Sequence, residues 1–249
     1  PEDLQLIKGT PSGRRRFLDM EISQTSATYY HQLMQYNRLL QQRNAVLKEY
    51  RGKQNIPLEE WDLQLADMAS FIVKKRLESL KKINLLIDLM NRKLTGGLEN
   101  LTIGYEQPYM DNGSLEYTKE GFYERIKAAL PQDRHRMTTS VGPPRDDLRF
   151  FSDAMDLKKF GSQGQQRTAV LSLKLSELEF IKSEVGEYPV LLLDDVLSEL
   201  DESRRANLLQ FIHKRIQTFI TTTDIHDFKD LKSVQFISCE GGKVQYGQP

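Results

Sequence analysis

A run of four apolar residues that ends in two carboxylates constrains the fold of this chain more than any other stretch. Residues 190–193 read Val-Leu-Leu-Leu, and Asp194 and Asp195 follow directly. An uninterrupted apolar run of this length predicts a strand buried on both faces of a mainly parallel sheet. Ligands bind such sheets beyond the carboxyl ends of the strands, so both carboxylates are expected at a binding edge. A strand that ends in a solvated acidic turn is the open alternative for these six residues alone.

The remaining sequence divides into a helical half and an α/β half. Apolar residues recur at helical spacing from residue 25 to residue 95, with Ser26 as a predicted N-cap and Pro57 as a break between two long helices. Another short helix is predicted at residues 122–130, closed by Pro131. The last hundred residues alternate between helices predicted at 165–185 and 202–214 and strands predicted at 190–193, 218–222, 234–238 and 243–246.

Composition excludes several classes of protein. Lys and Arg total 35 and balance 35 Asp and Glu, which speaks against a uniformly basic nucleic-acid binder but not against local basic faces. The longest apolar run is far too short to span a membrane, so no membrane partner is expected. The single cysteine, Cys239, excludes an internal disulfide framework and is typical of a reducing cytoplasm. None of the four His has metal-ligand spacing, so no zinc site is expected.

Three further motifs accompany the carboxylates in a defined order along the chain. Upstream, Ser162-Gln163-Gly164-Gln165-Gln166 opens a predicted helix, where a hydroxyl and unpaired backbone N–H groups suit a phosphate. A plain helix cap is the alternative for this pentapeptide. Downstream lie Ser198-Glu199-Leu200-Asp201 and a strand that ends in Thr221-Thr222-Thr223-Asp224. In this setting Asp194 is expected to hold Mg²⁺, and Asp195 is expected to orient or deprotonate an attacking water.

Together these motifs resemble those of the RecF family, a group within the ABC-type ATPases. Residues 162–168 resemble the RecF signature, which has Gln where transporters usually have Gly, and residues 191–201 resemble its fused Walker B strand and D-loop. Asp195 stands where most ABC ATPases have a catalytic Glu, as it does in RecF. The resemblance extends over nearly the whole chain, although Pro144 replaces a His that is common in the family.

The resemblance implies an α/β fold, namely lobe II of an ABC-type ATPase head with its P-loop NTPase sheet, plus a mostly helical arm. The expected domains are the end of lobe I and a connector at residues 1–20, the arm at 21–135, and lobe II at 136–249. The phosphate-binding motif Gly-x-x-x-x-Gly-Lys-Ser/Thr occurs nowhere in the 249 residues. We therefore expect a chain that lacks the N-terminal Walker A portion of the family and does not hydrolyse ATP alone.

For the complete protein, the resemblance assigns a role to each motif. Two ATP molecules would lie between the subunits of a homodimer, each held by one subunit and contacted in trans by the signature of the other. The residues implied are Ser162, Gln163, Gly164, Gln165 and Gln166 in the signature, Asp194 for Mg²⁺, Asp195 for the attacking water, Ser198 and Asp201 in the D-loop at the dimer seam, and Thr223 at the switch position.

The implied function is recombinational DNA repair in the bacterial cytoplasm, associated with the nucleoid and with the SOS response. The ATP-bound dimer would bind double-stranded DNA at junctions with single-stranded gaps and would help to load recombinase together with RecR and RecO. Its ATPase activity would be weak and DNA-dependent. The alternative is a non-enzymatic module, consisting of the arm and lobe II, that binds RecR or DNA without nucleotide.

A DNA-binding protein needs exposed cations, and two clusters are candidates. The first comprises Arg14, Arg15 and Arg16, and the second comprises Lys74, Lys75, Arg76, Lys81 and Lys82. Contacts to phosphates through such residues predict binding that is non-specific and sensitive to salt. The alternatives are a solvated helix face for the second cluster and a structural arginine, braced between sheet and arm, in the first.

Overall fold

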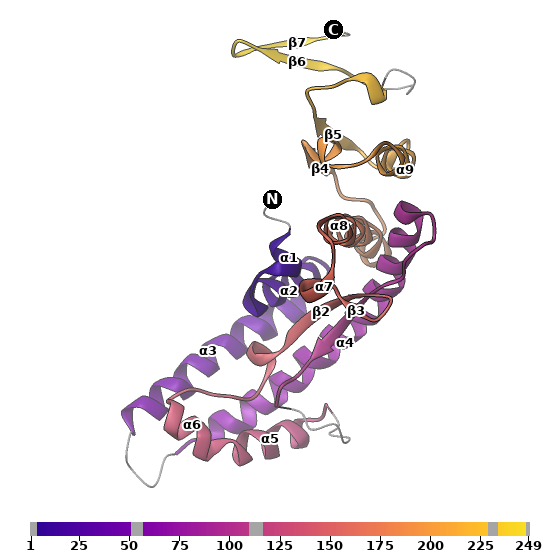
Figure 1. Cartoon of the computed structure of the whole chain (residues 1–249). Coiled ribbons are helices and arrows are strands. Elements are labelled where there is room, and N and C mark those ends of the chain that lie inside the picture. Colours follow the sequence, from indigo (N-terminus) through magenta and orange to yellow (C-terminus); the bar gives the residue numbers. More distant parts are fainter. Residues whose placement is uncertain (1–3, 51–56, 110–116, 229–233, 248–249) are drawn as a thin grey trace. The chain divides into compact units, whose positions relative to one another are not determined.

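The computed structural model describes residues 4–50, 57–109, 117–228 and 234–247 (Figure 1). The chain divides into two compact units, Pro1–Tyr188 and Pro189–Pro249. This division differs from the boundaries expected from the sequence, because residue 20 lies inside one helix and residue 135 lies inside another. The predicted three-part division remains a prediction, and the two units are described separately.

Where the structure describes it, the first unit is mostly helical and contains one small sheet. Its helices and strands are α1 (Gln5–Lys8), α2 (Pro11–Thr25), α3 (Ala27–Glu49), α4 (Glu59–Thr95), β1 (Leu101–Glu106), α5 (Lys119–Ala128), α6 (Leu130–Arg136), η1 (Pro143–Arg145), β2 (Asp147–Ser152), β3 (Met155–Asp156), α7 (Leu157–Phe160) and α8 (Gln163–Val185).

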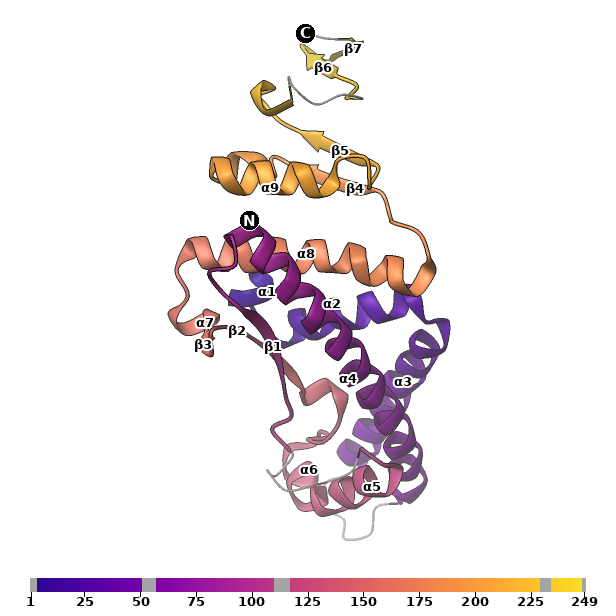
Figure 2. The ribbon, with the colours of Figure 1, turned by 90° about the vertical axis from the view of Figure 1, so that its right-hand side faces the viewer.

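Helix α4 is the central element of this unit. It packs against α3, α5, α8 and β1, and both ribbon views show α3 running beside it with α5 and α6 at their far end (Figures 1 and 2). Apolar residues three or four positions apart, such as Leu65, Ala69 and Ile72, are fully buried on its packed face. Gly96 ends the helix in the left-handed conformation at φ +69°, which glycine adopts without steric cost. The predicted long second helix is thereby confirmed.

Helix α2 was not predicted from the sequence, and one predicted helix end was wrong. Residues 1–20 were expected to hold the end of lobe I and a connector, and α2 begins within them at Pro11 behind the N-cap Thr10, whose hydroxyl accepts from the backbone N–H of Gly13. Proline is favoured in the first turn of a helix, because the N–H that it lacks would be unpaired there. The same reasoning applies to Pro131, which lies in the first turn of α6 instead of closing the preceding helix.

The sheet of the first unit is antiparallel, with the strand order β1-β2-β3. Leu101 pairs with Ser152 at one end of the β1–β2 ladder, and Glu106 pairs with Asp147 at the other. Just before β2, Gly142 adopts φ +114°, and a side chain there would overlap the hydroxyl of Tyr36. Only glycine therefore fits this close approach between the loop and α3.

The described part of the second unit contains a parallel strand pair, an antiparallel hairpin, one α-helix and two short 3₁₀ helices. Its elements are β4 (Leu191–Asp194), η2 (Val196–Glu199), α9 (Glu202–Ile212), β5 (Thr218–Thr221), η3 (His226–Phe228), β6 (Ile237–Glu240) and β7 (Lys243–Tyr246). The sheet was expected to be mainly parallel, but among the described strands only β4 and β5 pair in that way.

The apolar strand β4 is buried on one face only. Leu193 is buried, whereas Leu192 is 72% exposed and its registered partner on β5, Phe219, is 53% exposed. Within the second unit, β4 is therefore not buried on both faces as predicted, because no described element of that unit covers the face that Leu192 and Phe219 share.

Candidate functional site

Asp194 and Thr221 end the two parallel strands as a registered pair. Asp194 is the last residue of β4 and Thr221 the last of β5, and they pair in the sheet. The Thr221 hydroxyl donates to Asp194 Oδ1 at 2.6 Å, and the backbone N–H of Asp195 donates to the same hydroxyl at 3.0 Å. Both carboxylates are exposed. The predicted placement of the two carboxylates at the carboxyl end of a parallel strand is confirmed.

Asp195 leaves the strand in an unusual backbone conformation. Its φ is +50°, in the left-handed region, which Asp and Asn tolerate better than most other residues. The 3₁₀ turn η2 follows at once, and the Ser198 hydroxyl donates to the carbonyl of Asp195 at 2.8 Å. Ser198 therefore holds the backbone of Asp195 in place. The role at a dimer seam that its motif predicts stays a prediction.

The remaining downstream residues have local partners. Asp201 caps α9 by accepting from the backbone N–H of Arg204 at 2.9 Å and forms an ion pair with the same residue at 3.1 Å. Beyond β5, Thr222 and Asp224 close a tight turn through their own side-chain and backbone bonds. Thr223, the predicted switch residue, is exposed between them. The residue that bonds the carboxylate of Asp194 and the backbone N–H of Asp195 is instead Thr221, which the motif comparison did not select.

The oxygen atoms at this edge fit Mg²⁺. Mg²⁺ prefers oxygen ligands, retains several waters and is commonly held by one or two carboxylates together with substrate phosphates. Asp194 and Asp195 supply carboxylates of that kind, and within the described residues Asp194 Oδ2 has no protein hydrogen-bond partner. Among those residues no group of three or more His, Cys, Asp or Glu side chains could together hold a metal ion. The site therefore suits a metal that arrives with a phosphate ligand better than a metal enclosed by protein.

The predicted signature residues divide into an exposed part and a structural part. Ser162 caps α8 in a reciprocal capping box: its hydroxyl accepts from Gln165 N at 3.2 Å, and its own N–H donates to Gln165 Oε1 at 3.0 Å. Gln166 is buried and donates to the carbonyl of Leu157 at 2.7 Å. Gln163 and Gly164 are exposed together with Ser162. This loop belongs to the first unit, whereas the carboxylates belong to the second.

The structure corrects the DNA-binding expectation for Arg76, which is buried at 2% exposure. Its guanidinium donates to both carboxylate oxygens of Asp19 at 2.9 Å, to the carbonyl of Pro143 at 2.8 Å and to Asp146 Oδ2 at 3.2 Å. Arg76 thereby joins α2, α4 and the segment before β2, and it has no surface to offer to a phosphate. Burial also raises the pKa of Asp146 to about 6, against the lowering effect of Arg76 and of hydrogen bonds from neighbouring tyrosines.

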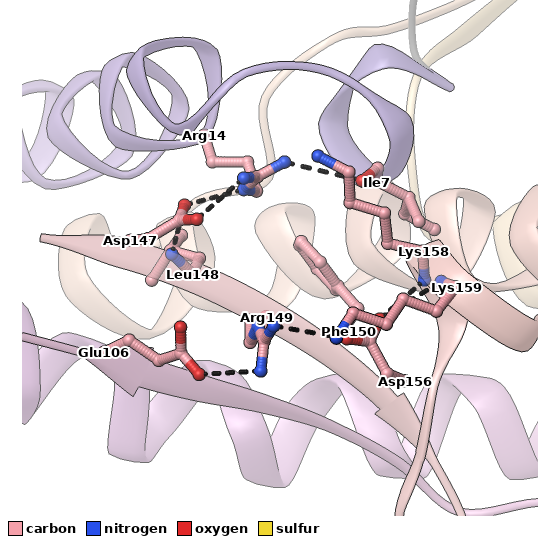
Figure 3. Close-up of a pocket in the computed structure, with 10 residues that line it drawn as sticks. All are labelled: Ile7, Arg14, Glu106, Asp147, Leu148, Arg149, Phe150, Asp156, Lys158 and Lys159. Carbon is pink, nitrogen blue, oxygen red and sulfur yellow. Dashed lines mark hydrogen bonds and ion pairs between the residues drawn. The ribbon is translucent and has the colours of Figure 1, made fainter. Parts of the chain in front are cut away.

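Arg14 requires the same correction. It is 3% exposed, and its side chain makes two hydrogen bonds of 2.8 Å to the carboxylate of Asp147 at the start of β2 (Figure 3). This bidentate pair lies in a cleft of about 400 Å³ beside β2. The next cation in the cleft, Arg149, is paired in turn with Glu106 at 2.9 Å and Asp156 at 3.7 Å. Arg14 therefore braces α2 against the sheet, which is the alternative that the sequence left open.

The other six predicted DNA contacts differ in exposure. Arg15 is half-buried and donates to the carbonyl of Asp146 at 2.7 Å, and burial lowers the pKa of its guanidinium. Lys75 forms an ion pair with Glu78 at 3.6 Å, and Lys82 forms one with Glu184 at 2.5 Å. The exposed members of the two clusters are Arg16, Lys74, Lys81 and Lys82. Pro144, the departure from the family pattern, is half-buried in η1.

The described part of the chain contains no helix that is both long and apolar enough to cross a membrane.

Several known proteins are similar to this chain over most of its length. A protein from Alkaliphilus oremlandii named DNA replication and repair protein RecF is 50% identical over 234 residues, which cover 93% of this chain and 64% of that protein. Its namesake from Halalkalibacterium halodurans is 44% identical over 251 residues, covering 98% and 68%. The chain thus spans about two thirds of the length of these curated relatives. No family model matches the chain.

Solved structures of RecF proteins are also similar to this chain. Two structures of the recombination mediator protein RecF in the RecFOR pathway, designated RecF-ATPrS and RecF-ATP, match with a TM-score of 0.85 at 36% identity, covering 99% of this chain and 66% of theirs. A Smc head domain from Pyrococcus furiosus, bound to the C-terminal domain of ScpA, matches with a TM-score of 0.52 at 13% identity, which shows the fold alone. The α/β fold of an ABC-type ATPase head, predicted from the sequence, is confirmed by these likenesses.

Proposed function

The chain belongs to the RecF family of DNA replication and repair proteins, and we propose that it acts as part of an ATP-dependent DNA-repair protein. The complete protein would bind ATP, dimerise around it and bind DNA at junctions with single-stranded gaps. RecR and RecO would be its partners in loading recombinase, a role supported by the RecFOR pathway named for its solved relatives.

The observation that carries this proposal is the paired strand end in the second unit. Asp194 and Asp195 follow a strand of a parallel pair, and Thr221 bonds both of them from the neighbouring strand end. Such an edge is where α/β sheets bind ligands, and its oxygen atoms suit a magnesium ion that accompanies a phosphate. The designation RecF-ATP of a relative with the same fold supports ATP as the ligand.

Each group at this edge has one chemical task. Asp194 would hold Mg²⁺, which when bound would neutralise charge on the transferred phosphoryl group. Asp195 would accept a hydrogen bond from the attacking water and orient it. The exposed Ser162, Gln163 and Gly164 at the start of α8 would contact the nucleotide of the other subunit, where the helix N-terminus favours a negative charge.

The exposed cations would supply the DNA contacts. Arg16, Lys74 and Lys81 are exposed, and Lys82 has only a surface ion pair, which contributes little to stability and exchanges readily for a phosphate. Lysine contacts of this kind attract DNA without reading its sequence. Gap specificity would then come from the shape of the closed dimer.

The proposal is tested with Asp195→Asn in a full-length RecF-family protein that carries this chain. Asparagine keeps the shape of the side chain and tolerates the left-handed backbone of Asp195, but it is a far weaker acceptor for the attacking water. We expect ATP binding to persist, phosphate release to fall by at least about 100-fold, and an ATP-bound dimer to accumulate in light scattering. Glu202→Gln, an exposed neutralisation on α9, is the matched control and should behave as the unsubstituted protein.

Two outcomes would count against the proposal. Rapid hydrolysis by Asp195→Asn would move the water-positioning role to another residue. Failure of the unsubstituted protein to bind ATP or to dimerise with it would favour the non-enzymatic alternative. In that case the 249-residue chain, which lacks the Gly-x-x-x-x-Gly-Lys-Ser/Thr motif, should bind DNA or RecR with equal affinity in the presence and absence of nucleotide.

A further inference from the structure

The Thr221 hydroxyl bonds both the carboxylate of Asp194 and the backbone N–H of Asp195, and the direction of these hydrogen bonds follows from chemistry. A backbone N–H can only donate, so the bond of 3.0 Å from Asp195 N uses the hydroxyl as an acceptor. The hydroxyl has one proton, and the bond of 2.6 Å directs it to Asp194 Oδ1. A single oxygen therefore relays one chain of hydrogen bonds from the backbone of Asp195 to the carboxylate of Asp194.

This relay has two geometric consequences. It occupies Oδ1 of Asp194 and restricts the rotation of that carboxylate, whereas Oδ2 has no hydrogen-bond partner among the described residues. It also anchors the N–H of Asp195 at the point where φ becomes +50° and the chain turns into η2. The carboxylate of one residue and the backbone of the next thus depend on the same hydroxyl.

We propose that Thr221 is the positioning residue of this site, which orients Asp194 toward Mg²⁺ and holds Asp195 where it meets the attacking water. The proposal rests on the proposed function and adds a residue that the motif order does not identify. Groups that orient a metal-binding side chain typically change metal affinity or activity by about 10–100-fold when they are removed. Thr223, two residues further, has no comparable contact with either carboxylate among the described residues.

The solvent exposure of the site allows a positioning role of Thr221 to be distinguished from a purely structural role. Asp194, Asp195 and Thr221 are all exposed, so water can replace the lost bonds and folding should change little when the hydroxyl is removed. Water in place of a fixed hydroxyl cannot hold the carboxylate in one orientation. A functional relay therefore predicts a large change in metal dependence with little change in thermal stability.

The test compares Thr221→Val, Thr221→Ser and the unsubstituted full-length protein. Valine preserves the β-branched shape and removes the hydroxyl, whereas serine restores the hydroxyl. We expect Thr221→Val to weaken Mn²⁺ binding to the ATP-loaded protein, measured by electron paramagnetic resonance, by about 10–100-fold. The Mg²⁺ concentration for half-maximal hydrolysis should rise by a similar factor, and ATP affinity measured without divalent metal should not change. Thr221→Ser should recover most of both losses.

The possible outcomes keep this inference distinct from the proposed function. Equal metal dependence of Thr221→Val and the unsubstituted protein, while Asp195→Asn abolishes hydrolysis, would overturn the role of Thr221 and leave the proposed function intact. Equal losses in Thr221→Ser and Thr221→Val would overturn it too, because the hydroxyl would then not be the active group. If the unsubstituted protein neither binds nor hydrolyses ATP, the proposed function fails first and this inference with it.

Discussion

Replacing Arg76 tests whether the cation in the centre of α4 is structural. Methionine preserves much of the side-chain volume but removes the charge, and it leaves the carboxylates of Asp19 and Asp146 without their cation. The Asp146 side chain is fully buried and that of Asp19 is 18% exposed, so water cannot readily solvate the first of them. Removing one partner of a buried ion pair typically costs about 3–5 kcal/mol. We expect Arg76→Met to lower the free energy of unfolding by about that amount.

The chain offers a built-in probe for this measurement. Its only tryptophan, Trp61, lies in α4 within the first unit, so its fluorescence follows the unfolding of that unit in urea. A loss of about 3–5 kcal/mol corresponds to a lower melting temperature by about 6–20 °C for a unit of this size. Lys74→Met is the matched control, because this residue is exposed on the same helix and should change stability by less than about 0.5 kcal/mol.

A rescue experiment separates charge from packing. If unpaired carboxylates cause the loss, Arg76→Met combined with Asp19→Asn and Asp146→Asn should be more stable than Arg76→Met alone. The reasoning is refuted if Arg76→Met unfolds within about 1 kcal/mol of the unsubstituted chain. An unchanged stability together with weaker DNA binding would instead return Arg76 to the DNA-binding surface.

Two further predictions concern Asp146 and the exposed lysines. Because the pKa of Asp146 is raised to about 6 from 3.8, the native state holds a proton in this interval that the unfolded chain has released, so its contribution to stability falls as the pH rises through the interval. Urea unfolding between about pH 4 and pH 7 should therefore show a weaker fall with pH for Asp146→Asn, and an identical slope would contradict the shift. Reversing Lys74 and Lys81 to Glu should weaken DNA binding and reduce the salt slope by about two, as measured by fluorescence anisotropy, whereas unchanged affinity would identify a merely solvated face.

Local patterns were sufficient to predict many elements of the fold. The amphipathic spacing along α4, the cap Ser26 and the apolar run of β4 each depend on residues within a few positions of one another. Errors arose where the answer depended on distant residues. Pro131 is compatible with the end of one helix or with the first turn of the next. Only the packing of α5 against α6 decides between these two positions. Burial of Leu192 depends on what covers its face, which the strand itself does not encode.

In the candidate site, too, local sequence predicted some residues and only the fold identified others. The order of the motifs and the two carboxylates, Asp194 and Asp195, could be read from the chain because they are contiguous. Thr221 could not be selected by its motif, although one signal was available. It ends a strand predicted to run parallel to the strand that ends at Asp194, and parallel strands present their carboxyl ends at one edge. Choosing it over Thr223 required the register, which places Asp194 directly opposite Thr221.

The amino-acid sequence by itself determined the class of this protein: the family resemblance, the helical segments and the acidic end of β4 all follow from local order. Only the tertiary structure decided which cations are exposed to solvent and which are paired in the core. Arg76 and Lys74 are both cations on one helix, but Arg76 meets Asp19 and Asp146, 57 and 70 residues away in the chain, whereas Lys74 is exposed to solvent. A charge acts on DNA or on the protein core according to the partners that folding brings to it, because a buried charge must be paired and an exposed one need not be.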